Sequence, residues 1–154
     1  MKLIEPIQRP AIKAIPKLAQ TYAQFSGLLN KLNENNLPDT VANEINKDIE
    51  ELNSVSDSEK ILRKQIRKKQ GKIITFIEKE LKFVVKNHYR NTWLAIGMSV
   101  FGIPLGIIFG SIFENMAFIG IGLPIGMVFG IALGTQMDKK AFAEGRQIDI
   151  ELKL

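Results

Sequence analysis

The sequence predicts an all-α membrane protein in which a helical domain precedes a hairpin of two membrane-spanning helices. The chain has 154 residues and a formal net charge of +5, yet between Asn91 and Met137 its only charged residue is Glu114. Before that stretch, apolar residues recur at helical spacing between short breaker sequences. The predicted organisation is a Pro-rich N-terminal arm (1–16), a cytoplasmic domain of three amphipathic helices (17–90), a transmembrane hairpin (91–137) and a cytoplasmic tail (138–154).

Two uncharged runs are long enough to cross a membrane. Trp93–Phe113 contains 21 residues and Met116–Met137 contains 22. As helices they would each extend about 32 Å, close to the hydrocarbon thickness of about 30 Å. Because backbone groups in lipid need internal partners, both runs should be helical, and the short link between them makes them antiparallel neighbours. The alternative is a buried hairpin in a soluble protein, but this small chain has too little polar protein to cover one.

The charges beside the two runs predict the orientation. Lysines and arginines lie before the first run and after the second, whereas the turn carries only Glu114. Positive charge collects on the cytoplasmic side, so we expect two spans in the inner (cytoplasmic) membrane, with both termini cytoplasmic. Tyr89 and Trp93 fit the aromatic belt at the membrane interface. His88 fits a polar anchor there, with a ligand or proton-relay role as the alternative.

Glycines recur at steps of four in both runs. They are Gly102, Gly106 and Gly110 in the first run, and Gly122, Gly126, Gly130 and Gly134 in the second. Such steps place each set along one helix face, where small residues let backbones approach closely in lipid. The simplest interpretation is packing within one hairpin. We favour self-association into a homo-oligomer, with or without a lumen, because Gly97 and Gly120 lie off these ladders and widen the small-residue surface.

Two prolines occupy equivalent places in the repeated segments "FGIPLGIIFG" and "IGLPIGMVFG". Pro104 and Pro124 lack an N–H group, which frees the carbonyl four residues earlier, at Val100 and Gly120. Static kinks that shape the packing are the simplest interpretation. A hinge, or a carbonyl exposed to a water-filled path, is the functional alternative.

The stretch "NTWLAIGMSVFGIPLGIIFGSIFENMAFIGIGLPIGMVFGIALGTQMDKK" (Asn91–Lys140) resembles the small bacterial two-span glycine-zipper membrane proteins. The likeness rests on Trp-Leu-Ala-Ile-Gly near the start, an Asn-x-Ala-like turn into the second span and a charged end. The resemblance implies a two-helix membrane unit and oligomerisation. It implies no particular biochemical activity. The prolines and the long preceding domain depart from the simplest members.

Apolar stripes predict three helices before the membrane. The first covers 17–36 and the second starts with Asp39 or Thr40 as its cap. The third starts with Ser56 or Ser58 as its cap and runs towards Arg90, into the first span, with Gly71 as its weak point. Their stripes are Leu18, Tyr22, Phe25, Leu29 and Leu32; Val41, Ile45, Ile49 and Leu52; and Leu62, Ile66, Ile73, Ile77, Leu81 and Val84. A small bundle and coiled-coil pairing between chains both fit these stripes.

A basic run, "KILRKQIRKKQGK", lies on the third helix. No aromatic residue interleaves with it, so we do not expect nucleic acid as a partner. A solvated face is the simplest interpretation. Anionic lipid or a phosphate-bearing partner are the alternatives, with Arg63, Lys64, Arg67 and Lys68 as the candidate contacts. Lipid contact would require the bundle to fold back, because a continuous helix places Arg67 about 39 Å from Trp93.

The tail "IDIELKL" alternates between apolar and polar residues, with Ile148, Ile150, Leu152 and Leu154 on one side. A lone strand is unstable, so we expect disorder, with docking onto a partner as the alternative.

No catalytic, cofactor-binding or metal site is predicted, and we expect no enzyme activity. The chain has no cysteine and one histidine, which excludes most metal-site spacings, and it has no phosphate-binding loop motif. Two functions fit. One is an oligomeric channel or pore regulated by the cytoplasmic domain. The other is a membrane anchor that recruits a cytoplasmic protein partner. The lipid bilayer is a partner in both.

Overall fold

The computed structural model describes residues 2–56 and 58–152, so Leu154 of the predicted tail stripe lies outside the described residues. The chain divides into two compact units. The first contains the residues up to Val85 together with the tail from Ile148, and the second is Lys86–Gln147. As predicted, amphipathic helices precede a hairpin of two long apolar helices. Each unit is described by itself.

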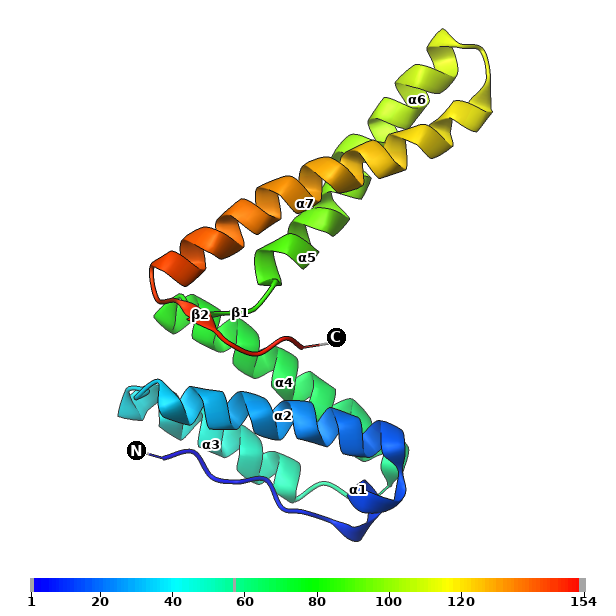
Figure 1. The fold of residues 1–154 in the computed structure, drawn as a ribbon. Helices are drawn as coiled ribbons and strands as arrows, with labels where there is room; N and C mark the ends of the chain where they lie inside the picture. Colours follow the sequence, from blue (N-terminus) through cyan, green and yellow to red (C-terminus); the bar gives the residue numbers. More distant parts are fainter. Residues whose placement is uncertain (1, 57, 153–154) are drawn as a thin grey trace. The chain divides into compact units, whose positions relative to one another are not determined.

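Among the described residues, the helices of the first unit are α1 (Pro10–Ala14), α2 (Pro16–Glu34), α3 (Asp39–Asn53) and α4 (Glu59–Leu81) (Figure 1). With the exception of Val84, the three predicted stripes meet in one core within a single chain, which favours the bundle interpretation. Phe25, at 0% exposure, is among the largest fully buried side chains. Asp39 is the first residue of α3 rather than its cap, because Pro38 takes the cap position.

The predicted continuous helix from the third stripe into the membrane is wrong. α4 ends at Leu81, where Lys82 adopts a left-handed backbone with φ 58°. The next residues form strand β1 (Val84–Val85), which pairs with β2 (Gln147–Ile148). Asn87 is again left-handed, with φ 60°, before the next helix starts. The predicted weak point at Gly71 lies inside α4, which continues through it.

The N-terminal arm is held on the bundle by asparagine side chains. Three backbone N–H groups of the arm donate to asparagine Oδ1 atoms: Leu3 to Asn33 at 2.8 Å, Ile4 to Asn46 at 2.8 Å and Ile7 to Asn53 at 2.9 Å. An extended segment has no intrahelical partners, so these amides satisfy donors that folding would otherwise leave unpaired.

Arg9 fixes the end of the same arm. Its guanidinium donates to the backbone carbonyls of Asn53 at 2.7 Å and Val55 at 2.5 Å. Asn53 is the last residue of α3 and Val55 lies just beyond it, so the cation is next to the negative end of the helix dipole, where it is stabilising.

A buried ionic cluster joins α3 to α4. The Asp48 side chain, only 5% exposed, accepts hydrogen bonds from the Nζ atoms of Lys69 at 2.7 Å and Lys72 at 2.8 Å. Lys69 also pairs with Glu51. Burial alone would raise the pKa of Asp48, but the two ammonium groups outweigh it and hold that pKa below its ordinary value. This pairing explains how the mostly buried side chain of Lys69 is accommodated on α4.

The C-terminal tail contributes to the core of the first unit, which corrects the expected disorder. Ile148 and Leu152 are buried at 2% and 6% exposure. Ile150 packs against α2, where its Cδ1 atom lies 3.2 Å from the position that a Cβ on Gly27 would take. The tail therefore buries alternate side chains against its own chain, and its first residues pair with β1.

The second unit is the hairpin. Its first arm comprises α5 (His88–Ile96), a π-helical segment (Gly97–Gly102) and α6 (Ile103–Ile112). A short 3-10 turn (Met116–Phe118) leads into α7 (Ile119–Ala143), which runs alongside the first arm in Figure 1. The two apolar stretches contain 25 and 28 residues, His88–Ile112 and Met116–Ala143, so both helices extend beyond the predicted spans at their charged ends.

Candidate functional site

The contact face between the two arms of the hairpin is built from the glycine ladders. All seven predicted ladder glycines are buried. A Cβ on Gly106 would lie 2.6 Å from the carbonyl oxygen of Ile119, and one on Gly134 would lie 2.5 Å from the Cα of Arg90. The backbone of the facing helix thus occupies the place of a side chain. Gly110, near the turn, is less tightly packed, because a Cβ on it would lie 3.5 Å from its nearest neighbour, a side-chain carbon of Ile119.

Gly97 belongs to this face, although the sequence placed it off the ladder. It is five residues from Gly102, a step that in an α-helix rotates a residue well away from the ladder face. The segment between them is π-helical, with the N–H of Ile103 donating to the carbonyl of Met98. Bonds of this i to i+5 type bring residues five apart near to one face. Gly97 consequently packs against Gly126 and Gly130.

The outer faces of the hairpin are different in character. Gly120 is exposed and would place a Cβ in open space, so this glycine lies outside the contact face. Large apolar side chains cover both arms on the outside, among them Val100, Phe101, Ile103, Ile107, Ile108, Ile112, Ile121, Val128, Phe129 and Leu133. Such a surface suits contact with lipid chains.

The two prolines lie in different helical contexts. Pro104 is in the first turn of α6, directly after the π-helical segment, whereas Pro124 lies inside α7. Both are exposed. In the π-helical segment, the Ser99 hydroxyl donates to the carbonyl of Ala95 at 2.8 Å. The repeated decapeptides therefore share a sequence pattern but adopt different local structures.

Asp138 completes the ladder of α7, and the sequence analysis missed it. It follows Gly134 by the same four-residue step, and it is 7% exposed. Its Oδ1 and Oδ2 atoms accept hydrogen bonds from the backbone N–H groups of Tyr89 at 3.1 Å and Arg90 at 2.9 Å. These donors are in the first turn of α5, so an acidic group on α7 satisfies them and complements the helix dipole. The four-residue step was the available signal.

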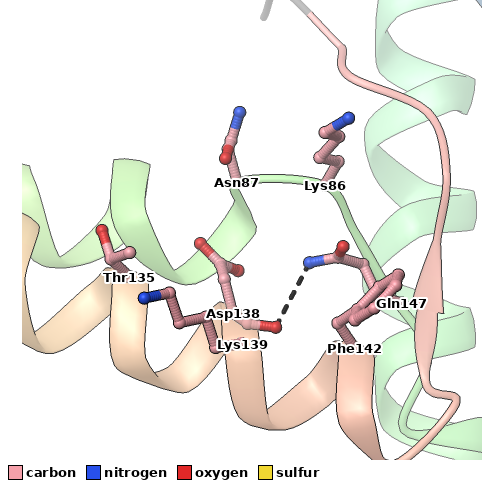
Figure 2. A pocket seen from close by; sticks show the side chains of 7 residues that line it. All are labelled: Lys86, Asn87, Thr135, Asp138, Lys139, Phe142 and Gln147. Atoms are coloured by element: carbon pink, nitrogen blue, oxygen red, sulfur yellow. Dashed lines mark hydrogen bonds between the residues drawn. The ribbon is translucent and has the colours of Figure 1, made fainter.

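An open cavity of about 250 Å³ lies beside Asp138 at the charged end of the hairpin. Figure 2 shows its lining residues: Lys86, Asn87, Thr135, Asp138, Lys139, Phe142 and Gln147. The Nε2 atom of Gln147 donates to the backbone carbonyl of Asp138 at 3.4 Å, which links the end of the unit to α7.

The remaining predicted residues fall in two places. Tyr89 and Trp93 are half-buried on α5, and the Tyr89 ring packs edge-on against His88, with ring centroids 5.1 Å apart. Near Tyr89, hydrogen bonds raise the pKa of Arg146, the larger effect coming from Glu144 and the smaller from Tyr89. Lys64, Arg67 and Lys68 are exposed on α4 in the first unit, and Arg63 is half-buried there.

Within residues 2–56 and 58–152, no three acidic or histidine side chains gather as metal ligands would. Comparison with curated proteins and with solved structures found no match. The predicted resemblance of Asn91–Lys140 to glycine-zipper membrane proteins is confirmed, because this stretch lies within a family match. Residues 88–140 match the family model described as "Glycine zipper membrane protein", so this part of the chain is similar to that family of membrane proteins.

Proposed function

We propose that the hairpin is a membrane anchor that holds the helical domain at the cytoplasmic surface, where this domain recruits a protein partner. One observation carries the proposal. The ladder glycines are all buried inside a single hairpin, and beside each of them except Gly110 the facing backbone fills the space. The ladder is therefore occupied before a second copy arrives, and one chain forms a complete two-helix membrane unit.

Charge supports the proposed orientation. Lys86 and Arg90 lie at the start of the first arm and Lys139 and Lys140 at the end of the second, whereas the turn carries Glu114. Under the positive-inside rule both charged ends face the cytoplasm. The N-terminal domain and the tail would then share that side, consistent with their forming one unit.

The exposed face of α4 is the proposed recruiting surface. Lys60, Lys64, Arg67 and Lys68 are exposed along it. Positive charge distributed along a surface in this way increases the association rate of an acidic partner, and this increase becomes smaller at higher ionic strength. The partner we propose is an acidic protein surface.

An oligomeric channel or pore is the second candidate. It would have to use the outer faces, where small residues are exposed: Ala95 and Ser99, one turn apart on the first arm, and Gly120 on the second. Small residues on membrane helices favour close packing, so these positions are where a second hairpin would dock.

Oligomer size and ion flux separate the two candidates. The full chain is prepared as wild type, Gly126→Leu and Gly120→Leu, and each is measured by light scattering in detergent and by ion flux in liposomes. The anchor proposal expects a single-chain particle and no flux above protein-free liposomes. It also expects Gly120→Leu to behave as wild type, with Gly126→Leu unfolding the hairpin. A conducting oligomer that Gly120→Leu dissociates would support the pore.

Cysteine labelling tests the orientation. The chain has no cysteine, so Asn115→Cys introduces a single thiol at the turn. A membrane-impermeant maleimide should label it in intact cells. Labelling only after lysis would reverse the proposed topology.

A further inference from the structure

The turn between the two arms carries the only charge in the apolar part of the hairpin. Glu114 has a left-handed backbone there, with φ 50°, and it is exposed. The nearest charged residues in the chain are Arg90 and Asp138, at the other end of the hairpin and about 30 Å away along the arms. The turn therefore presents a single negative charge, far from the other charges of the hairpin.

Most of the side chains next to Glu114 are apolar. Ile112, Phe113 and Met116 are exposed at 66%, 56% and 71%. The rings of Phe113 and Phe118 stack, with centroids 4.7 Å apart. Large apolar side chains of this kind favour the bilayer, whereas a charged group is costly there. The side chains of the turn thus favour entry into the membrane, with Glu114 as the opposing group.

The backbone of the turn has hydrogen-bond partners within the hairpin itself. The N–H of Glu114 donates to the carbonyl of Ser111 at 3.4 Å, and the N–H of Asn115 donates to the carbonyl of Gly110 at 3.0 Å. The Oδ1 atom of Asn115 accepts from the N–H of Ala117 at 2.9 Å. Backbone groups without partners are costly in lipid, and these bonds lower that cost. The carboxylate of Glu114 is then the main barrier when the turn crosses the membrane.

The sign of this charge determines how the membrane potential acts on the turn. In the proposed orientation the turn passes from the cytoplasm to the outside, and the cytoplasmic side is electrically negative. A negative charge that moves outwards is driven by this potential, and about 100 mV favours its complete transfer by about fiftyfold. The same potential holds the basic residues of the charged end on the cytoplasmic side.

We propose that the membrane potential drives insertion of the hairpin by acting on Glu114. The inference rests on the proposed orientation, in which the turn lies outside. A charge is least stable at the bilayer centre, so at the barrier it has crossed about half of the potential. A potential of about 100 mV should therefore accelerate insertion about sevenfold.

The rate at which the turn reaches the outside can be measured in pulse-labelled cells. The parent is the full chain with Asn115→Cys, its only thiol, which a membrane-impermeant maleimide labels on arrival. Labelling after lysis gives the total thiol and corrects for thiol reactivity. Rates are measured with and without a protonophore, in the parent and after adding Glu114→Gln, Glu114→Lys or Glu50→Gln. Glu50 is exposed on α3, so its variant is the matched control that removes a charge which does not cross.

The protonophore should slow the parent and the Glu50→Gln variant about sevenfold for each 100 mV that it dissipates. The Glu114→Gln variant should stay within about twofold, because no charge crosses, and the Glu114→Lys variant should become faster. Equal slowing of the parent and the Glu114→Gln variant would overturn the proposal, because the potential would then act elsewhere. A parent rate that the protonophore leaves unchanged would overturn it as well.

The same labelling distinguishes this failure from failure of the proposed orientation. A turn that labels from outside at a rate independent of the potential keeps the orientation and removes the role of Glu114. A turn that labels only after lysis, with and without the protonophore, reverses the orientation and removes the inference with it.

Discussion

Gly97 and Gly126 each occupy the space that a side chain on the other would need. A Cβ on Gly97 would meet the carbonyl oxygen of Gly126, and a Cβ on Gly126 would meet the carbonyl oxygen of Gly97. Gly102 and Gly122 repeat this reciprocal relationship nearer the turn. At these levels the two arms touch through backbone atoms, which maximises van der Waals contact where lipid provides no hydrophobic driving force.

Replacing Gly126 by alanine should therefore destabilise the hairpin. The added methyl group must displace backbone, and overpacking of this kind costs about 1–3 kcal/mol. Gly120→Ala is the matched control on the same helix, because its Cβ enters open space. It should leave the stability unchanged or raise it slightly, since alanine favours the helix by about 1 kcal/mol. Thermal unfolding in detergent measures both, and equal effects would contradict the packing described.

Deleting Val100 should be tolerated better than deleting Ile108. Both side chains are exposed, at 57% and 51%. The first deletion shortens the step from Gly97 to Gly102 to four residues, so a regular α-helix would keep both glycines on the contact face. The second deletion shortens the step from Gly106 to Gly110 to three and rotates the ladder. The same unfolding measurement should rank Val100 deletion closer to wild type, and the reverse order would contradict the role given to the π-helical segment.

Asp138→Ala should loosen the start of α5. Loss of a capping acceptor costs about 0.5–2 kcal/mol, and hydrogen exchange at the amides of Tyr89 and Arg90 should accelerate. Asp138→Asn keeps an acceptor and should fall between alanine and wild type. Glu144→Ala, at an exposed position, is the control that removes a charge without removing the cap. Unchanged exchange in Asp138→Ala would mean that water replaces the carboxylate fully.

The first unit should lose stability in acid through Asp48. Its pKa lies below the ordinary value of 3.8 in the folded state, so its contribution is present above that value and is lost as the pH falls through the folded pKa. Asp48→Asn should cost about 1.5–3 kcal/mol at neutral pH and flatten this acid dependence. Urea titrations followed by amide NMR signals of α3 and α4 measure both, with the exposed Glu50→Gln as control. An acid dependence unchanged by Asp48→Asn would assign it to other carboxylates.

Asn46→Ala should release the N-terminal arm. The Oδ1 atom of Asn46 accepts from Ile4 at 2.8 Å, and its Nδ2 atom donates to the carbonyl of Lys2 at 3.4 Å. Loss of both bonds should raise the rate of tryptic cleavage after Lys2. Asn43→Ala, exposed on the same helix, should leave that rate unchanged. Equal cleavage rates in the two variants would indicate that the other asparagines suffice.

The helical spacing of apolar residues predicted most of the helices. The long uncharged runs between charged segments predicted the hairpin. Stripes such as Val41, Ile45, Ile49 and Leu52 bury the faces expected of them, because a 3.6-residue period leaves one apolar side to cover. The end of α4 could not be predicted in the same way. Lys82 and Asn87 adopt left-handed conformations. Neither residue is a glycine, which is the residue that would have indicated such a conformation in the sequence.

The site was predicted in part for similar reasons. The ladder glycines follow from a four-residue step, but the place of Gly97 depends on a π-helical segment that the α-helical period cannot represent. Asp138 looked like one charge among several at the end of the span. Its role appears only when α5 is placed beside α7, because its hydrogen bonds are to residues almost fifty positions earlier.

The contribution of the tail to the first unit has a consequence for biosynthesis. Residues up to Val85 leave the ribosome before the hairpin, yet Ile148 and Leu152, which complete their core, are translated after it. Until then β1 lacks its pairing strand and the tail's place in the core stays uncovered. The N-terminal domain can therefore finish folding only after the entire membrane segment has been synthesised. A completely folded N-terminal domain thus occurs only in chains whose hairpin has already been translated.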